Sequence, residues 1–117
     1  MEFNSCIQIY IVFLHPNALA MRIVAIKAIT EYVKVHSNAN VPLREWYKKT
    51  KQVEWTCLAD IKQTFNSVDF VGNNRYVFNI KGNDYRLVAI VIFSSKKVYI
   101  RFIGTHNEYD KIYCSNI

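Results

Sequence analysis

The stretch 75-RYVFNIKGNDYRLVAIVIFSSKKVYIRFIG-104 decides the fold class, because it has the pattern of three β-strands joined by short turns. Strands are expected at 75–81 and 84–93, since Gly82-Asn83 between them is a two-residue hairpin signal. A third strand is expected from Val98 to Gly104, after a turn at 94–97. Strands joined by such short turns predict an antiparallel sheet.

The turns also predict which residues face each other across the strands. A loop at 82–83 gives the pairs Lys81–Asp84, Asn79–Arg86 and Arg75–Ile90. A turn that joins Phe93 to Val98 gives the pairs Tyr99–Ile92, Arg101–Ile90 and Ile103–Val88. Arg75, Ile90 and Arg101 should therefore form one row across three strands, with Arg86 nearby on the middle strand.

Alternation along the strands divides the predicted sheet into two faces. The core face carries no charge and comprises Tyr76, Phe78, Ile80, Tyr85, Leu87, Ala89, Val91, Phe93, Val98, Ile100 and Phe102. The opposite face, called the outer face below, carries Arg75, Asn79, Lys81, Arg86, Tyr99 and Arg101 among four aliphatic residues. Because three arginines converge on it and only Asp84 is acidic, we expect the outer face to bind a ligand.

The residues before position 72 favour helices packed on this sheet. A short strand at 21–25 precedes a helical pattern that runs from Ile26 to His36. After a loop at 37–40, Pro42 suits the first turn of a helix at 42–51, and Thr56 can cap a third. Helices followed by an antiparallel sheet predict an α+β fold.

The first twenty residues differ from the rest of the chain. They contain a short apolar run and one charged residue, Glu2, so they lack the basic start of a signal peptide and the length of a membrane span. An edge strand or an unstructured tail is possible for this leader, but we favour Met21 as the natural start. Residues 21–117 then form a single domain, which is what 117 residues have room for.

The charge balance favours a polyanionic partner. The chain carries +6 at neutral pH, and all fifteen Lys and Arg lie in residues 21–117 against eight acids. Such a basic, aromatic-rich domain is typical of RNA or DNA binding. The three cysteines are far apart and have no zinc-type spacing, which favours reduced thiols in a cytoplasmic protein.

The arginines of the outer face suit phosphate, because guanidinium presents a fixed fork of donors and stays charged. The sequence has no phosphate-binding glycine loop, no dinucleotide fingerprint and no H-E-x-x-H motif. It also lacks the paired carboxylates of a two-metal nuclease, so any chemistry is expected to need neither metal nor cofactor. RNA allows this, since its own 2′-hydroxyl can attack the adjacent phosphate.

Such a reaction needs a base, an acid and cations, and the candidates follow the last strand: His106, Tyr109, Asp110 and Lys111. Thr105 with Glu108 three residues later is a capping box, which predicts a short helix starting at His106. The helix dipole should favour a neutral imidazole there and attract phosphate. Tyr109 and Asp110 return to the same side of that helix.

Three stretches of the chain resemble the HigB family of bacterial toxin–antitoxin toxins. They are PLREWYKKTKQVEWTCLADIKQTF, FVGNNRYVFNIKGNDYRLVAIVIF and VYIRFIGTHNEYDKI, and the likeness spans residues 21–117. The resemblance implies a RelE-like fold with two or three helices on a twisted antiparallel sheet and a short C-terminal helix. It also implies a ribosome-dependent mRNA endonuclease that is neutralised by a HigA-type antitoxin.

Carried over to this chain, the resemblance implies that Arg86 and Arg101 hold the scissile phosphate. His106 is then the principal acid/base residue, Tyr109 stacks a base or donates a proton, and Asp110 orients the imidazole. Lys81 and Arg75 then supply further cationic contacts. Independently of the resemblance, Asn79 and Tyr99 on the outer face are expected to help hold an RNA backbone and stack a base. Two alternatives stay open: a non-catalytic inhibitor such as the ParE-type toxins that block DNA gyrase, and an RNA-binding module without cleavage activity.

Overall fold

The computed structural model describes residues 20–112 and 116–117. Apart from Ala20, the leader predicted at 1–20 lies outside the described residues. The elements of the described part are β1 (Arg22–Val24), α2 (Lys27–Val35), the 3-10 helix η2 (Ser37–Ala39), α3 (Asn40–Lys51), α4 (Leu58–Thr64), β2 (Val68–Phe70), β3 (Arg75–Ile80), β4 (Tyr85–Ile92), β5 (Lys97–Thr105) and α5 (His106–Tyr109). The α+β fold is confirmed.

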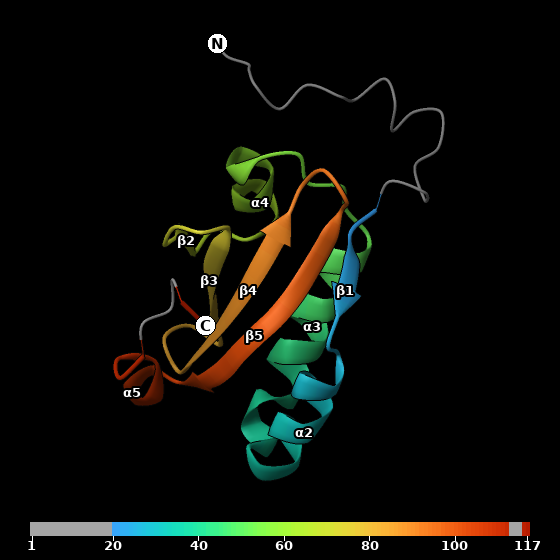
Figure 1. The fold of residues 1–117 in the computed structure, drawn as a ribbon. Helices are drawn as coiled ribbons and strands as arrows, with labels where there is room; N and C mark the ends of the chain where they lie inside the picture. The colour runs from blue at the N-terminus through green and yellow to red at the C-terminus, as the bar shows by residue number, and fades with distance from the viewer. Residues whose placement is uncertain (1–19, 113–115) are drawn as a thin grey trace.

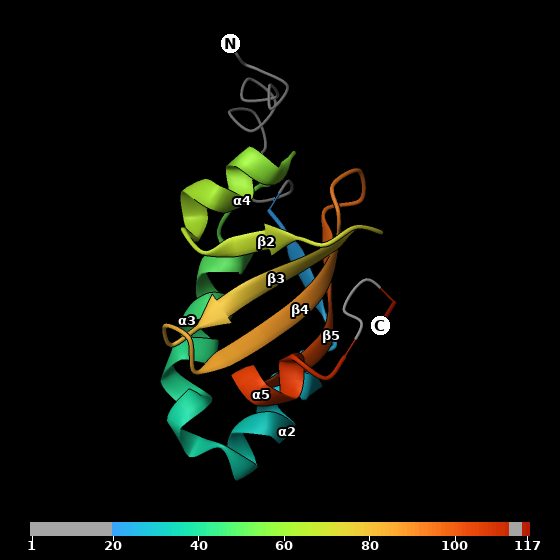
Figure 2. The same cartoon turned by 90° about the vertical axis from the view of Figure 1, so that its left-hand side faces the viewer.

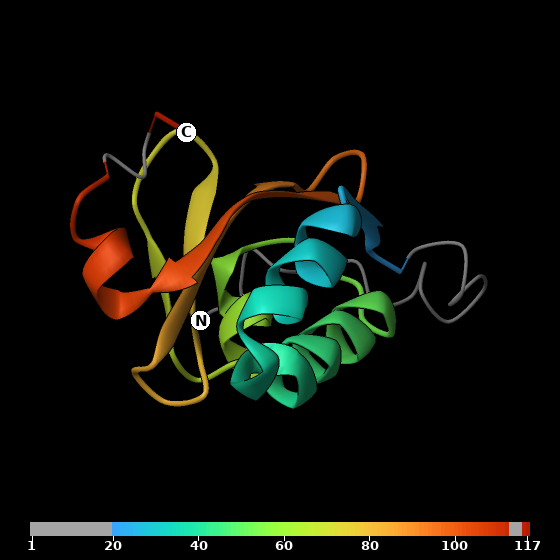
Figure 3. The ribbon, with the colours of Figure 1, turned by 90° about the horizontal axis from the view of Figure 1, so that it is seen from below.

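Five strands form one sheet in the order β1-β5-β4-β3-β2 (Figures 1 and 2). The pairs among β2, β3, β4 and β5 are antiparallel, as predicted, whereas β1 pairs with β5 in parallel. The parallel pair joins Arg22 to Lys97, so it links the first and last described strands. Helices α2 and α3 lie together on one side of the sheet, and α5 lies away from them at the end of β5 (Figure 3).

The first hairpin has the predicted register. Arg75 lies opposite Ile90 and Asn79 opposite Arg86. The turn places Gly82 at a φ of +63°, a backbone conformation that glycine adopts without strain. The local hairpin signal was therefore sufficient to align β3 with β4.

The second hairpin differs from the prediction in two ways. Tyr99, not Arg101, lies opposite Ile90, and a β-bulge interrupts the ladder at Val88 and Ala89. Ala89 pairs with Ile100 and Val88 pairs with Phe102, which leaves Arg101 as the extra residue of the bulge. The predicted row of Arg75, Ile90 and Arg101 is therefore wrong.

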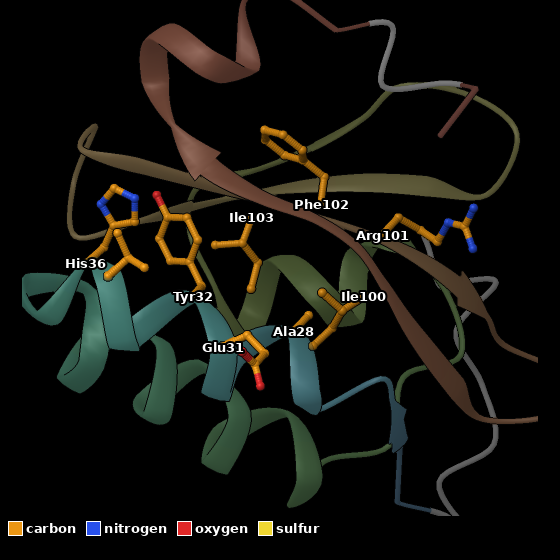
Figure 4. A pocket seen from close by; sticks show the side chains of 9 residues that line it. Ala28, Glu31, Tyr32, His36, Ile100, Arg101, Phe102 and Ile103 are labelled. Carbon is orange, nitrogen blue, oxygen red and sulfur yellow. The ribbon is translucent and has the colours of Figure 1, made fainter.

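The bulge also exchanges the faces of the residues that follow it, because one inserted residue shifts the alternation by one. Phe102 was assigned to the core face but shares the outer face with Val88, its cross-strand partner. Ile103, which pairs with Leu87, packs against the core instead. Figure 4 shows Ile100 and Ile103 pointing toward α2, whereas Phe102 points away from it.

The core between the helices and the sheet is built around aromatic rings. Phe78 on β3 is buried with its ring centroid 5.4 Å from Trp46, 6.1 Å from Trp55 and 5.5 Å from Phe65. These contacts join α3 and the segments on both sides of α4 to the sheet. The core thus packs against the face of the sheet opposite the outer-face residues.

Two helix boundaries and one expectation for cysteine differ from the sequence interpretation. Helix α3 begins at Asn40, two residues before the predicted start. Cys57, not Thr56, is the N-cap of α4, and the Thr56 hydroxyl donates instead to the Asp60 carboxylate at 2.7 Å. Cys57 is disulfide-bonded, against the expectation of reduced thiols, and Cys6 and Cys114 lie outside the described residues. No helix among the described residues is long and apolar enough to cross a membrane.

Candidate active site on the outer face

The predicted capping box begins α5. The Thr105 hydroxyl accepts a hydrogen bond from the Glu108 backbone N–H at 3.2 Å, and the Thr105 N–H donates to the Glu108 carboxylate at 2.8 Å. The N–H of His106 donates to the Asp84 carbonyl at 3.2 Å. Because Asp84 lies in the turn between β3 and β4, this bond attaches the start of α5 to the neighbouring hairpin.

The structure brings together His106 and Asp110, as the helical spacing predicted. Nε2 of His106 lies 3.7 Å from Oδ2 of Asp110, and both side chains are about half exposed. The distance is too long for a direct hydrogen bond, so the two groups are neighbours that are not hydrogen-bonded to each other. An accessible imidazole beside a carboxylate can exchange protons with a bound substrate.

Arg86 and Tyr109 also lie together. The Arg86 carbon Cζ is 5.9 Å from the centre of the Tyr109 ring, within the range of a cation–π contact. Arg86 is only 9% exposed, and its Nη1 donates to the carbonyls of Asn83 and Tyr85, each at 3.2 Å. Arg86 therefore packs against the Tyr109 ring of α5, and its buried positive charge lies next to the site. Arg86, His106, Tyr109 and Asp110 are called the α5 cluster below.

Arg101 stands apart from the α5 cluster. Its side chain is exposed and forms no hydrogen bond or ion pair with another described residue. The bulge places it between the levels of Val88 and Ala89, nearer to Arg86 along the sheet than the predicted register did. This exposed guanidinium is available to a ligand that crosses the outer face.

Arg75 is further away and has its own partners. Its Nε and Nη2 donate to the carbonyl oxygen of Ile117 at 3.0 and 2.5 Å, and its Nη1 donates to the Asn73 carbonyl at 2.9 Å. The predicted convergence of three arginines is thus reduced to Arg86 and Arg101. The structure gives no sign that Arg75 joins them.

The other residues predicted to contact RNA, Lys81, Asn79 and Tyr99, lie at separate positions along β3, β5 and the turn after β3. Lys81 forms an exposed ion pair of 3.6 Å with Asp84 at the turn, close to the start of α5. The Asn79 amide donates to the Ser67 hydroxyl, and Tyr99 is half-buried opposite Ile90. The outer face is also less open than predicted, since the aliphatic residues Val77 and Val88 are buried.

A groove of about 480 Å³ separates α2 from β5 (Figure 4). Tyr32 and His36 stack there with ring centroids 4.3 Å apart, and Arg101 lies at its border. Burial, with smaller contributions from Glu108 and Tyr85, raises the pKa of Tyr32 to about 12. No local sequence pattern indicates this groove, because α2 and β5 meet only in the folded chain. Among residues 20–112 and 116–117, no three His, Cys, Asp or Glu side chains gather as metal ligands would.

Comparison with known proteins gives a family match over most of the domain. Residues 39–112 match a family model described as HigB_toxin, the RelE-like toxic component of a toxin–antitoxin system. A protein of Escherichia coli K12 named mRNA interferase toxin HigB is 48% identical over 52 residues, 43% of this chain and 50% of that protein. A protein of Shigella flexneri named mRNA interferase HigB has the same identity and coverage.

A more distant relative aligns over more of the chain. A protein of Escherichia coli O6:H1 named mRNA interferase HigB is 27% identical over 94 residues, 79% of this chain and 91% of that protein. For the K12 and Shigella proteins the chain spans about half the length of the relative.

Proposed function

The chain belongs to the HigB toxin family, the RelE-like toxic components of toxin–antitoxin systems, and on this premise we propose that it is a ribosome-dependent mRNA endonuclease that inhibits translation. The names of its relatives, which are mRNA interferases, support the activity. The α5 cluster is the observation that carries the proposal. It combines an accessible imidazole, a carboxylate, a phenol and a guanidinium on one small helix and the strand beneath it.

In the proposed reaction the 2′-oxygen of the RNA attacks the adjacent phosphorus. His106 accepts the 2′-hydroxyl proton, the bond from phosphorus to the 5′-oxygen breaks, and the 5′-oxygen takes up a proton from Tyr109 or water. Asp110 orients the imidazole and stabilises its positive charge after proton transfer. The products are a 2′,3′-cyclic phosphate and a 5′-hydroxyl end, so the reaction needs no added water and no redox partner.

The cations have separate tasks in this proposal. Arg101, which is exposed, binds the scissile phosphate as negative charge develops on its oxygens. Arg86, which is buried under Tyr109, adds positive charge beneath the site and holds α5 in place. Lys81, Asn79, Tyr99 and Arg75 extend the contact surface along the RNA on both sides of the cleaved bond.

The proposed partners are mRNA, the ribosome and an antitoxin of the HigA type, in the cytoplasm where translation occurs. Membership in a toxin–antitoxin family supports the antitoxin. The net charge of +6 supports an RNA partner, since phosphate neutralisation by Lys and Arg supplies most of the sequence-independent affinity.

The test is expression of site variants in bacterial cells. We expect His106→Ala and Arg101→Ala each to abolish growth arrest, because one removes the proton acceptor and the other the phosphate contact. Lys62→Ala, an exposed cation on α4 outside the site, should keep full toxicity. Circular dichroism checks that all three variants fold. Full toxicity of both site variants would show that the α5 cluster and Arg101 are not the site.

The chemistry is tested on purified ribosomes programmed with mRNA. We expect ends with a 2′,3′-cyclic phosphate, and cleavage that survives EDTA treatment of the enzyme once ribosomal magnesium is restored. Products with 3′-hydroxyl ends, or activity that returns only when a metal is added to the enzyme, would refute the 2′-hydroxyl mechanism.

A further inference from the structure

We propose that Phe102 is the stacking platform for a nucleobase next to the cleaved phosphate, a role that rests on the proposed function and adds a binding residue to it. The alternation of the sequence assigned this ring to the core. The structure places it on the outer face, between the exposed Arg101 and the helix that carries His106.

The bulge at Arg101 is what exposes Phe102 to the site. Val88, its partner across the ladder, belongs to the same outer-face row as Val77, and neither residue is part of the core cluster. Phe102 is half-buried and is also absent from that cluster, whereas its neighbours Ile100 and Ile103 are packed in it or against it. An aromatic ring on this face is therefore not explained by the core between helices and sheet.

The Phe102 ring packs closely against the backbone of Gly104. A Cβ atom added to Gly104 would lie 2.4 Å from Cζ and 2.9 Å from Cε2 of Phe102, distances that no real side chain tolerates. The ring thus lies against the backbone of Gly104, which pairs with Arg86 on β4. Glu108 of α5 is next to the same position, with its Oε1 2.9 Å from the added Cβ. The ring therefore lies between the backbone of Gly104 and the start of α5.

Tyr109 is the aromatic residue of the α5 cluster, and its ring already contacts a protein cation. The Arg86 guanidinium lies over that ring, so Tyr109 is less suited to the base-stacking role predicted for it. A single-stranded RNA presents a phosphate and a base from each nucleotide, and aromatic side chains stack such bases. Arg101 and Phe102 are consecutive residues whose side chains point in different directions (Figure 4), so one can contact a phosphate and the other a neighbouring base of the same strand.

The binding test uses ribosomes programmed with mRNA whose riboses carry 2′-O-methyl groups, so that no cleavage can occur. Base stacking on an aromatic side chain is worth about 5- to 150-fold in affinity. We expect Phe102→Leu to weaken binding of the protein within that range and Phe102→Trp to stay within about three-fold of the unaltered protein. Gly104→Ala should also weaken binding, because its Cβ displaces the ring; since that Cβ also meets the Glu108 carboxylate of the capping box, its effect is compared with that of Glu108→Ala.

Phe93→Leu is the matched control, since Phe93 is half-buried in the turn after β4 and packs against Tyr76, away from α5. It should bind as the unaltered protein does. On unblocked mRNA, Phe102→Leu should raise KM more than it lowers kcat and should change the base preference at the cut sites. Thermal unfolding of all variants is recorded alongside.

The results separate this inference from the proposed function. Unaltered protein that binds the blocked complex but leaves unblocked mRNA intact would refute the endonuclease proposal and leave the stacking role standing. Equal binding by Phe102→Leu and unaltered protein would refute the stacking role while cleavage persists. A loss of kcat and thermal stability at unchanged KM, without rescue by Phe102→Trp, would also refute it, because the ring would then only brace α5.

Discussion

Removing the Thr105 hydroxyl tests whether the capping box holds the site together. Helix α5 has four residues, too few to be stable alone, and the box supplies two of the hydrogen bonds at its start. Thr105→Ala deletes the bond from the Glu108 N–H and leaves that donor without its partner. The loss of an N-cap costs about 1 kcal/mol.

A cost of about 1 kcal/mol raises the population in which α5 is open by about five-fold. The amides of Asp110 and Lys111 report this opening, because they donate to the carbonyls of His106 and Glu108 at 3.1 and 3.2 Å. Their hydrogen exchange should therefore become about five-fold faster. Cleavage should fall by no more than the same factor, since only the closed form aims His106 at the substrate.

Thr105→Ser is the control, because serine keeps the capping oxygen, and its exchange rates should stay near those of the unaltered protein. The double variant Thr105→Ala/Glu108→Ala should cost less than the sum of the single changes, since both residues belong to one box. Unchanged exchange at Asp110 and Lys111 in Thr105→Ala would refute the idea that the cap stabilises α5.

Two further changes probe the scaffold. Lys96→Met should lower the free energy of unfolding in urea by about 3 kcal/mol. Nζ of Lys96 lies 3.0 Å from the Glu54 carboxylate, whose side chain is only 8% exposed, and it also donates to the Trp55 carbonyl. The substitution would leave that buried carboxylate without its cation. Adding Glu54→Gln should restore part of that loss; a further drop would contradict the ion-pair explanation. Tyr32→Phe should leave the melting temperature unchanged or raise it at pH 7, since the buried Tyr32 hydroxyl has no hydrogen-bond partner among the described residues. Because its pKa rises from 10 to about 12 on folding, the unaltered protein should lose stability as pH increases from 10 to 12 relative to Tyr32→Phe, and parallel melting curves at pH 11 would contradict this.

Features that depend on neighbouring residues were predictable from the sequence. The turn at Gly82 and Asn83 set the register of β3 against β4, and Thr105 with Glu108 set the start of α5. The spacing of His106 and Asp110 placed them on one side of that helix. Each of these inferences used a geometric rule that acts within a few residues.

Features that depend on the bulge were not predictable. Val98, Ile100 and Phe102 are all apolar at alternate positions, so the alternation looks unbroken through Arg101. Ile103 is apolar too, and with two adjacent apolar residues the sequence is compatible with either phase of the strand. Packing of the whole sheet against α2 selects Ile103 for the core and thereby moves Phe102 to the outer face.

Contacts between distant segments were also missed. The parallel pair of β1 and β5, the groove between α2 and β5 and the bond from Arg75 to Ile117 join residues far apart in the chain. No local pattern records such contacts. The hydrogen bonds from Arg75 to Ile117 could not be foreseen for this reason, whereas the contact of Arg86 with Tyr109 involves a strand whose register the first hairpin set.

The parallel pair of β1 and β5 has a consequence for the order in which the protein is made. The strand that leads into α2 cannot complete its pairing until Lys97–Tyr99 have left the ribosomal exit tunnel, and α5 follows those residues. Contacts between such distant segments form late in folding. A nascent chain therefore carries its helices before β5 and α5 complete the sheet and the outer face.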